Sequence, residues 1–314
     1  RPDGRANSSQ LIINKANQAG LAGLRDVLLN AHQEKFGNTE DLVIGFQLTH
    51  SGRFCRPEGK FKYEPKIAYR HPILDGKFGV LGDENVLSDE EVEVLITDFV
   101  KAARIAVEVG ADFVDIKHCH GYLLHEFLGA YTRAGRYGGS FENRTRILRE
   151  IVKGIRADGN GIDLAVRLST FDMVPFRPDP DKSQPDKLGP GIPEEHETPF
   201  PYQFGVSHED PTQIDLKETF EFVNLCSELG IKLLNTSAGV PYYTPHLQRP
   251  AAYPPSDGYQ SPYDPLVDVA RQINVVRDLK SQLPEGMAII ASGLSYLQEY
   301  LPHVCQALLR EGWT

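Results

Sequence analysis

The chain has 314 residues, a formal net charge of −10 and 40% hydrophobic residues, which is the composition of an ordinary globular protein. The negative charge argues against nucleic acid or an anionic membrane as a partner, and no apolar run reaches the roughly 18 residues of a membrane span. Cys55, Cys119, Cys226 and Cys305 form no CxxC pair, which disfavours a zinc or iron–sulfur site in these residues and predicts a cytoplasmic location.

The apolar pattern predicts alternating helices and strands along the chain. Strands are expected at 42–48, 113–116, 164–168, 232–235 and 287–291. Helices are expected at 21–36, 89–109, 216–229, 265–283 and 297–311, with a further helix from Ser140. The first helix should bury one face, formed by Leu21, Leu24, Val27, Leu28 and Ala31. Ser88 and Glu91 form a capping box at the start of the second helix.

The long loops at 54–87, 169–215 and 240–264 all follow the C-terminal end of a predicted strand. This asymmetry favours a (β/α)8 TIM barrel with its site at that face. A doubly wound sheet is the alternative, although no GxGxxG motif follows any strand. The strand at 113–116 should be buried on both faces, as in a parallel sheet. The loop at 169–215 is expected to be a lid or another functional loop without secondary structure.

Side chains that can bind ligands or donate protons cluster directly after the strand at 113–116. They are Lys117, His118, Cys119, His120 and Tyr122. Enzymes with parallel sheets build their sites at the C-terminal edge of the strands. We therefore expect the active site to lie here.

Two motifs in this region resemble the Old Yellow Enzyme family of FMN-dependent ene-reductases. Residues 137–144 read YGGSFENR, and residues 120–123 read HGYL. The resemblance implies that residues 1–314 form a single FMN-binding TIM-barrel domain, truncated at both ends and containing strands three to seven of eight. It also implies FMN as cofactor and NAD(P)H as reductant. The cluster cysteines of larger members would lie beyond Thr314, so this chain would not encode an iron–sulfur cluster.

The resemblance implies four cofactor-binding residues. Gln47 lies in QLTHSGR, similar to the family's QLWHAGR, and would read the pyrimidine edge of the flavin through its amide. Arg167 would place a guanidinium beside the flavin and stabilise its reduced, anionic form. Ser292 and Gly293 follow a strand and would offer backbone N–H groups to the FMN phosphate. His50 and Arg53 could contact the flavin or only order their loop.

On the substrate side, His120 would anchor the carbonyl or nitro oxygen of the substrate, and Tyr122 would donate a proton. Lys117 occupies the place of the family's first His, which is a departure from the pattern. It could replace that His as a cationic donor and prefer a carboxylate substrate, or it could form an ion pair under the flavin. The tyrosines of the loop at 240–264 could line a pocket or pack the loop. The YGGSFENR motif is expected to be structural.

The sequence therefore predicts an FMN-dependent oxidoreductase that takes hydride from NAD(P)H and passes it to an activated alkene or a similar electron-poor acceptor. One alternative is a metal-dependent TIM-barrel hydrolase that uses the His118/His120 pair. Another is a non-catalytic relative of the barrel. The expected partner is a small-molecule substrate, and a homo-oligomer remains open.

Overall fold

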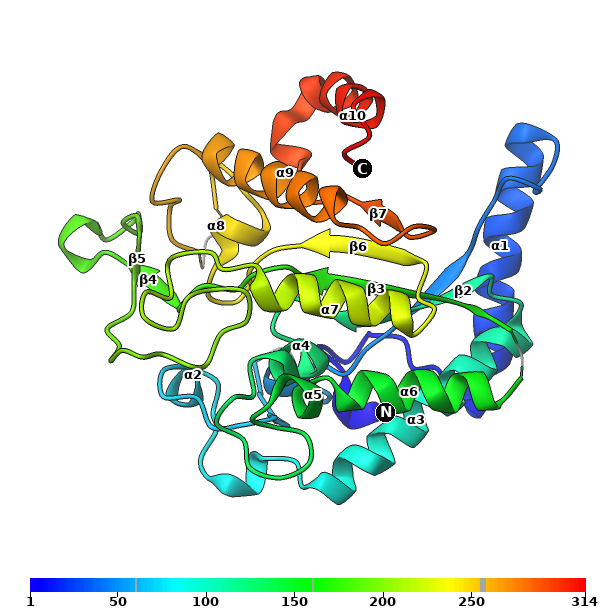
Figure 1. Cartoon of the computed structure of the whole chain (residues 1–314), viewed down its shortest axis with the longest axis horizontal. Helices are drawn as coiled ribbons and strands as arrows, with labels where there is room; N and C mark the ends of the chain where they lie inside the picture. The colour runs from blue at the N-terminus through cyan, green and yellow to red at the C-terminus, as the bar shows by residue number, and fades with distance from the viewer. Residues whose placement is uncertain (60, 160, 255–257) are drawn as a thin grey trace.

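The computed structural model describes residues 1–59, 61–159, 161–254 and 258–314. A five-stranded parallel sheet, in the order β1-β2-β3-β6-β7, lies at the centre of the molecule (Figure 1). Its strands are β1 (Gly45–Leu48), β2 (Phe113–His118), β3 (Asp163–Ser169), β6 (Leu233–Ser237) and β7 (Ala288–Ile290). All five strands lie where the sequence predicted them, although β1 begins three residues later than expected. The sheet order follows the chain order, as in a TIM barrel.

Helices connect consecutive strands, so each crossover returns the chain to the same edge of the sheet. The longer helices are α1 (Gln18–Phe36), α3 (Asp89–Val109), α6 (Arg146–Ala157), α7 (Lys217–Glu228), α9 (Pro265–Ser281) and α10 (Leu301–Arg310). The short helices are α2 (Leu74–Lys77), α4 (Leu123–Leu128), α5 (Phe141–Arg144) and α8 (Pro245–Gln248). The predicted helix at 297–311 is divided, because residues 295–300 form a 3₁₀ helix before α10.

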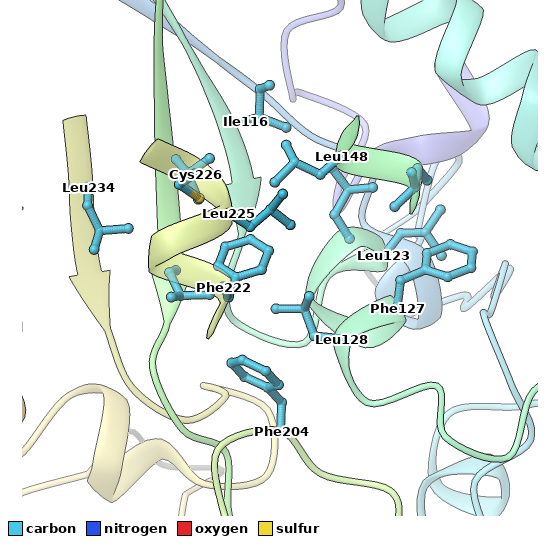
Figure 2. Packing of buried hydrophobic residues seen from close by; sticks show 14 of the residues in the cluster. Ile116, Leu123, Phe127, Leu128, Leu148, Phe204, Phe222, Leu225, Cys226 and Leu234 are labelled. Carbon is cyan, nitrogen blue, oxygen red and sulfur yellow. The ribbon is translucent and has the colours of Figure 1, made fainter. Parts of the chain in front are cut away.

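The main hydrophobic core lies between the sheet and the helices (Figure 2). Ile116 of β2 and Leu234 of β6 are fully buried there, against Leu148 of α6 and Phe222 of α7. Successive side chains of a strand point to opposite faces, so only alternate residues of each strand can enter this core. The helices therefore cover one face of the sheet.

The opposite face of the sheet is partly exposed and carries a group of polar side chains toward its C-terminal edge. Along β2, Val114, Ile116 and His118 are buried, whereas Asp115 and Lys117 between them are half-buried. The prediction that this strand is buried on both faces is therefore wrong for the described residues. Within those residues, β1 pairs only with β2 and β7 only with β6, so the sheet is open. The truncation of a single domain at both ends stays a prediction.

Helix α1 does not bury the face that its apolar residues predicted. Leu21 is buried, but Leu24, Val27 and Leu28 are 50%, 66% and 51% exposed. Figure 1 shows the helix at the margin of the molecule, with its C-terminal half away from the sheet. The 3.6-residue period identified the helix correctly, but it could not show which residues of the apolar face pack against another part of the chain.

The loop at 169–215 is more ordered than predicted. Strands β4 (Phe176–Pro178) and β5 (Gly191–Pro193) pair in an antiparallel hairpin within it. Asp172, at the start of the same loop, is buried and accepts a hydrogen bond from the Tyr243 hydroxyl at 2.5 Å. These contacts fix the loop to the segment that follows β6.

The YGGSFENR motif has a structural role, as predicted. The Ser140 side chain accepts a hydrogen bond from the Asn143 backbone N–H and caps α5. Arg144 is 1% exposed, donates to the carbonyl oxygens of Gly139 and Leu128, and pairs with Glu218 of α7 at 2.6 Å. The motif thus ties the segment after β2 to α7.

The cysteines and the helices bear on the environment in which the chain folds. Cys55, Cys119, Cys226 and Cys305 are free thiols. None of the helices among the described residues is long and apolar enough to cross a membrane. The cytoplasmic location stays a prediction.

We predict that Arg144→Ala lowers the free energy of unfolding by about 2–3 kcal/mol, because Oε1 of Glu218 and two carbonyl oxygens lose the donor that Arg144 supplies. Urea denaturation measures this change. Lys153→Ala, on the exposed side of α6, is the control and should change stability by less than about 0.5 kcal/mol. Equal effects of the two substitutions would contradict the structural role of Arg144.

Asp172 should make stability fall as the pH rises. Burial raises the pKa of this carboxyl from 3.8 to about 8, although hydrogen bonds from Tyr243 and Thr244 oppose the rise. Between pH 4 and pH 8 the unfolded chain releases the proton and the folded chain keeps it, so unfolding becomes easier by up to about 1.4 kcal/mol per pH unit.

The substitution Asp172→Asn removes this titration. Denaturation curves at pH 5 and pH 7 should show the variant gaining stability relative to the unmodified protein at the higher pH. Asp26→Asn, at an exposed position of α1, is the matched control. A constant difference between Asp172→Asn and the unmodified protein at both pH values would show that Asp172 is already ionised in the folded state.

Candidate functional site

Polar side chains from four neighbouring strands meet on the uncovered face of the sheet, which we call the concave face. Gln47 of β1 is in register with Asp115 of β2. One step further toward the C-terminal edge, Lys117 of β2, Arg167 of β3 and Asn235 of β6 are in register with one another. The sheet register thus brings together Gln47, Lys117 and Arg167, which the sequence predicted separately.

Gln47 and Asp115 form a hydrogen-bonded pair. The Gln47 Nε2 atom donates to Oδ2 of Asp115 at 2.7 Å, and Gln47 is exposed on this face. The second carboxyl oxygen, Oδ1 of Asp115, is buried without a hydrogen-bond partner. Burial raises the pKa of Asp115, with the hydrogen bond from Gln47 as the largest opposing effect. Gln47 is therefore exposed toward a planar polar ligand, although it already shares its amide with Asp115, and its contact with the flavin stays a prediction.

Arg167 has donor capacity that the described residues do not use. Its Nε atom is buried without a hydrogen-bond partner, and so is Oδ1 of the neighbouring Asn235. An unpaired polar group inside a protein costs about 1–3 kcal/mol, so folded proteins seldom retain one unless it serves a ligand or water. A guanidinium and an amide oxygen side by side can hydrogen-bond the acceptors and donors of a heterocycle.

Lys117 lies against the ring of Tyr122, with Nζ 3.7 Å from the ring centroid. Such a cation–π contact stabilises the ammonium form and fixes its position. Burial lowers the pKa of Lys117, and the charge of Arg167 lowers it further. Among the described residues, Nζ has neither a hydrogen bond nor an ion-pair partner.

His120 follows β2 in a left-handed backbone conformation, with φ of 63°, which is unusual for a residue other than glycine. Its backbone N–H donates to Oγ of Ser169 at 3.0 Å, and its Nε2 atom lies 2.9 Å from Oγ of Ser237. Burial, and then the charges of Lys117 and Arg167, lower the pKa of His120 to about 2. His120 is therefore a neutral imidazole at neutral pH.

The hydroxyl of Tyr122 lies 3.2 Å from the hydroxyl of Tyr242, which comes from the loop after β6. Burial raises the pKa of Tyr122 above its usual range, so the phenol keeps its proton at neutral pH. Tyr242 stacks on Phe54, with ring centroids 3.9 Å apart. The predicted proton donor is thus held between two loops that follow different strands.

Ser292 and Gly293 lie directly after β7, at the same edge of the sheet. The Ser292 hydroxyl donates to the carbonyl oxygen of Thr236. Gly293 has φ of 83°, and a Cβ atom there would lie 2.1 Å from the amide oxygen of Gln272. Only glycine fits this turn without displacing Gln272. This geometry is compatible with the phosphate-binding turn that the resemblance implied.

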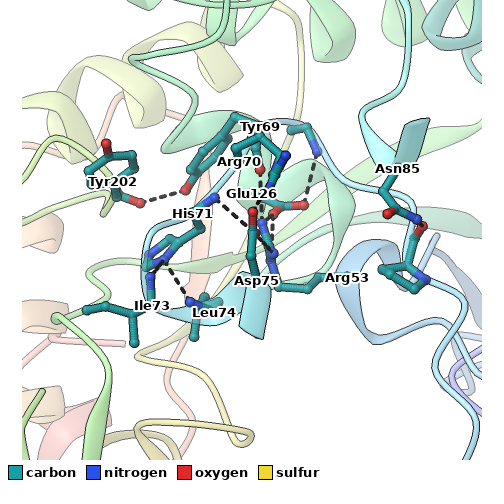
Figure 3. A network of polar contacts seen from close by, with 12 residues as sticks. Arg53, Tyr69, Arg70, His71, Ile73, Leu74, Asp75, Asn85, Glu126 and Tyr202 are labelled. Atoms are coloured by element: carbon teal, nitrogen blue, oxygen red, sulfur yellow. Dashed lines mark hydrogen bonds and ion pairs between the residues drawn. The ribbon is translucent and has the colours of Figure 1, made fainter. Parts of the chain in front are cut away.

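Arg53 belongs to a structural network rather than to the concave face (Figure 3). Its guanidinium pairs with Asp75 and Glu126 and donates to the carbonyl oxygen of Tyr69. His50 is also buried, and its Nδ1 atom accepts a hydrogen bond from the Gly52 backbone N–H at 3.1 Å. These contacts support the hypothesis that both residues order their loop.

The structure does not bring His118 and His120 together as metal ligands. His118 points toward the helices, where its ring lies 5.4 Å from that of Phe222 and its Nδ1 atom lies 3.0 Å from the carbonyl oxygen of Ile116. Within the described ranges, no three His, Cys, Asp or Glu side chains are grouped to hold a metal ion. The metal-hydrolase alternative is wrong on this geometry, because β2 ends at His118 and the chain turns before His120, whose φ is 63°.

Sequence reasoning missed two members of the concave face. Asn235 lies in a predicted strand. The signal in the sequence that it faces the uncovered side of the sheet is that it is polar and lies two residues before Ser237. Tyr242 was one of several tyrosines whose role stayed open. Of those, Tyr243 and Tyr259 are buried: the Tyr243 hydroxyl donates to Asp172 of the loop after β3, and the Tyr259 hydroxyl donates to the carbonyl oxygen of Tyr243. Tyr253 is 92% exposed.

A cavity of about 580 Å³ lies beside the outer edge of β1. Its lining combines the N-terminal segment with β1 and α3, including Ile12, Gln47, Leu48, Leu95 and Phe99. It shares Gln47 with the concave face but none of Lys117, His120, Tyr122 or Arg167. The predicted catalytic residues therefore lie outside this cavity.

Comparisons with known proteins show which family this chain resembles. The model of the NADH:flavin oxidoreductase / NADH oxidase family matches residues 2–181, which include β1, β2 and β3. The chain is 26% identical over 218 residues to NADH:flavin oxidoreductase FG08077 of Gibberella zeae, covering 65% of this chain and 46% of that protein. It is 38% identical over 133 residues to the NADPH dehydrogenase of Bacillus subtilis, covering 42% and 37%.

A solved structure shows the same fold. The Old Yellow Enzyme homologue of Zymomonas mobilis superposes with a TM-score of 0.59 at 20% identity, over 100% of this chain and 70% of that one. The chain spans less than half the length of the two curated relatives. The family match covers more than half of the chain and contains both sequence motifs. The chain therefore belongs to the NADH:flavin oxidoreductase / NADH oxidase family, the Old Yellow Enzyme family that its motifs resemble.

Proposed function

We propose that this protein is an FMN-dependent oxidoreductase that takes hydride from NAD(P)H and passes it to an activated alkene or a similar electron-poor acceptor. The observation that carries the proposal is the group of unsatisfied polar atoms on the concave face, contributed by Asp115, Arg167 and Asn235. They lie in a chain whose family is named for NADH:flavin oxidoreduction. The names of the relatives, NADH:flavin oxidoreductase and NADPH dehydrogenase, support the same reductant.

The residues present fit a flavin. The isoalloxazine ring carries carbonyl oxygens and an N–H group on its pyrimidine edge, which require both donors and acceptors. Gln47 offers an amide, Arg167 offers an unused N–H donor, and Asn235 offers an unused oxygen. Ser292 and Gly293 would hold the phosphate through backbone N–H groups.

Bound FMN would supply hydride transfer, a reaction that no amino-acid side chain provides. Arg167 would stabilise negative charge that develops beside it, in a site where burial strengthens the interaction. His120 is neutral and can donate one N–H to an oxygen of the acceptor, with Ser237 orienting the ring. Tyr122 keeps its proton at neutral pH and can deliver it to a carbon of the acceptor. Tyr242 lies within reach to restore that proton.

The first test is the visible absorption spectrum of the purified protein, before and after anaerobic addition of NADPH or NADH. A flavin band that bleaches on reduction supports the proposal. A protein that is colourless and cannot be reconstituted with FMN contradicts it and favours the non-catalytic relative of the barrel.

Arg167→Leu should weaken FMN binding about 10- to 100-fold, because a charge-assisted hydrogen bond contributes about 1.5–3 kcal/mol. Titration of the apoprotein with FMN, followed by flavin fluorescence, measures the dissociation constant. Arg310→Leu, at an exposed position of α10, is the control and should bind FMN normally. Unchanged affinity in Arg167→Leu would remove Arg167 from the cofactor site.

Tyr122→Phe should slow the reduction of a generic acceptor such as 2-cyclohexen-1-one by about 10²-fold or more, which is the usual contribution of a general acid. Reduction of the flavin by NAD(P)H should proceed at its normal rate, because that step needs no proton from Tyr122. Stopped-flow absorbance separates the two steps. Tyr253→Phe is the exposed control, and equal slowing of both steps in Tyr122→Phe would indicate a structural role instead.

A further inference from the structure

We propose that the natural acceptor of this enzyme carries a carboxylate next to its reacting double bond, and that Lys117 binds this carboxylate as an ion pair. The inference rests on the proposed flavin function and adds the substrate class of the same site. Three observations carry it: the missing counterion of Lys117, the cationic side chains near His120, and the fixed position of the Lys117 ammonium.

Lys117 is a half-buried cation that has no ion-pair partner among the described residues. Its Nζ atom has neither a hydrogen bond nor an ion pair among the described residues. The carboxyl of Asp115, two residues earlier on the same strand, is already bonded to Gln47, and burial raises its pKa. An unpaired buried charge is costly, by several kcal/mol. A bound carboxylate would supply the partner that the described residues lack.

Three cationic side chains lie near His120. Lys117, Arg167 and Arg249 all lie close enough to His120 to lower its pKa. Arg249 is exposed and directly follows α8, so its charge comes from a segment outside the sheet. The chain as a whole carries a formal charge of −10, so this concentration of cations is a local feature. Such a field attracts an anionic ligand and disfavours a cationic one.

The position of the Lys117 ammonium is fixed before a substrate binds. Its contact with the Tyr122 ring, at 3.7 Å, places Nζ next to the proposed proton donor. The register with Arg167 keeps Lys117 at the same level of the sheet. A flexible lysine loses much side-chain entropy on binding, but one that already lies on an aromatic ring loses less. Lys117 is thus positioned before the ligand arrives.

Two donors in this site match the two oxygens of a carboxylate. Lys117 would pair with one oxygen, and the neutral His120 would donate an N–H to the other. A ketone or an amide has a single oxygen and no charge, so it would leave the ammonium without its ion pair. In the reaction, the nicotinamide loses a hydride, and the double bond gains that hydride at one carbon and a proton at the other. The carboxylate is unchanged.

Ligand binding tests the proposal without turnover. The flavin absorption of the holoenzyme is titrated with benzoate and with benzamide, which have the same shape and differ in charge. The unmodified protein should bind benzoate at least about 10-fold more tightly than benzamide, and the difference should shrink as the salt concentration rises. In Lys117→Met the preference should fall to about 1, whereas Lys117→Arg should retain part of it. Lys153→Met is the surface control.

Kinetics with a matched pair of acceptors provides the second readout. The ratio of kcat/KM for a 2-enoate to that for its methyl ester should fall at least about 10-fold in Lys117→Met. Arg249→Met should lower the same ratio less, because Arg249 acts only through its field.

The outcomes are distinguishable. If the flavin binds and NAD(P)H reduces it, but benzoate and benzamide bind the unmodified protein equally, the carboxylate proposal is wrong and the flavin function stands. If the protein binds no flavin, both are wrong. If Lys117→Met does not fold, the comparison of benzoate with benzamide in the unmodified protein and in Lys117→Gln still decides the matter.

Discussion

Side-chain alternation along the parallel strands is the constraint on which the rest of this structure depends. In β2, Ile116 enters the helical core, while Asp115 and Lys117 on either side of it point to the concave face. Because neighbouring strands are in register, the same alternation sets Arg167 and Asn235 beside Lys117. Strand alternation thus directs one set of side chains into the core under the helices and the other set into the row of ligand-binding groups.

Arg53, Arg144 and Arg167 use their guanidinium groups differently. Arg53 and Arg144 are almost fully buried, and each uses its guanidinium on carboxylates and carbonyl oxygens of the chain itself. Arg167 keeps a buried Nε without a partner. Arg133 and Arg149 also have a buried Nε without a partner, so the position of Arg167 beside Asn235 and Lys117 in the sheet, together with its unused donor, indicates its role. Lys117 lies in the same row and forms no ion pair among the described residues.

The loops that follow the strands complete the site from outside the sheet. Tyr242 from the loop after β6 lies beside Tyr122 from the segment after β2, and Ser237 orients His120. Phe54 from the loop after β1 stacks on Tyr242. Three loops that are distant in sequence therefore depend on one another. This dependence explains why the C-terminal edge of the sheet holds chemistry that no single motif contains.

The sequence by itself determined the local elements. Apolar periodicity located all five strands of the parallel sheet, and the Ser88–Glu91 capping box marked the start of α3. These features follow from short-range rules, in which a residue interacts with neighbours a few positions away. The motifs around His120 and Arg144 likewise identified the family, since they are continuous in the chain.

Only the tertiary structure decided which faces have neighbours. It left Leu24, Val27 and Leu28 of α1 exposed, and it turned His118 toward the core and away from His120. It also set Asn235 in register with Arg167, 68 positions apart in the sequence. Burial and register are properties of contacts between distant segments, and periodicity within one segment carries no information about them.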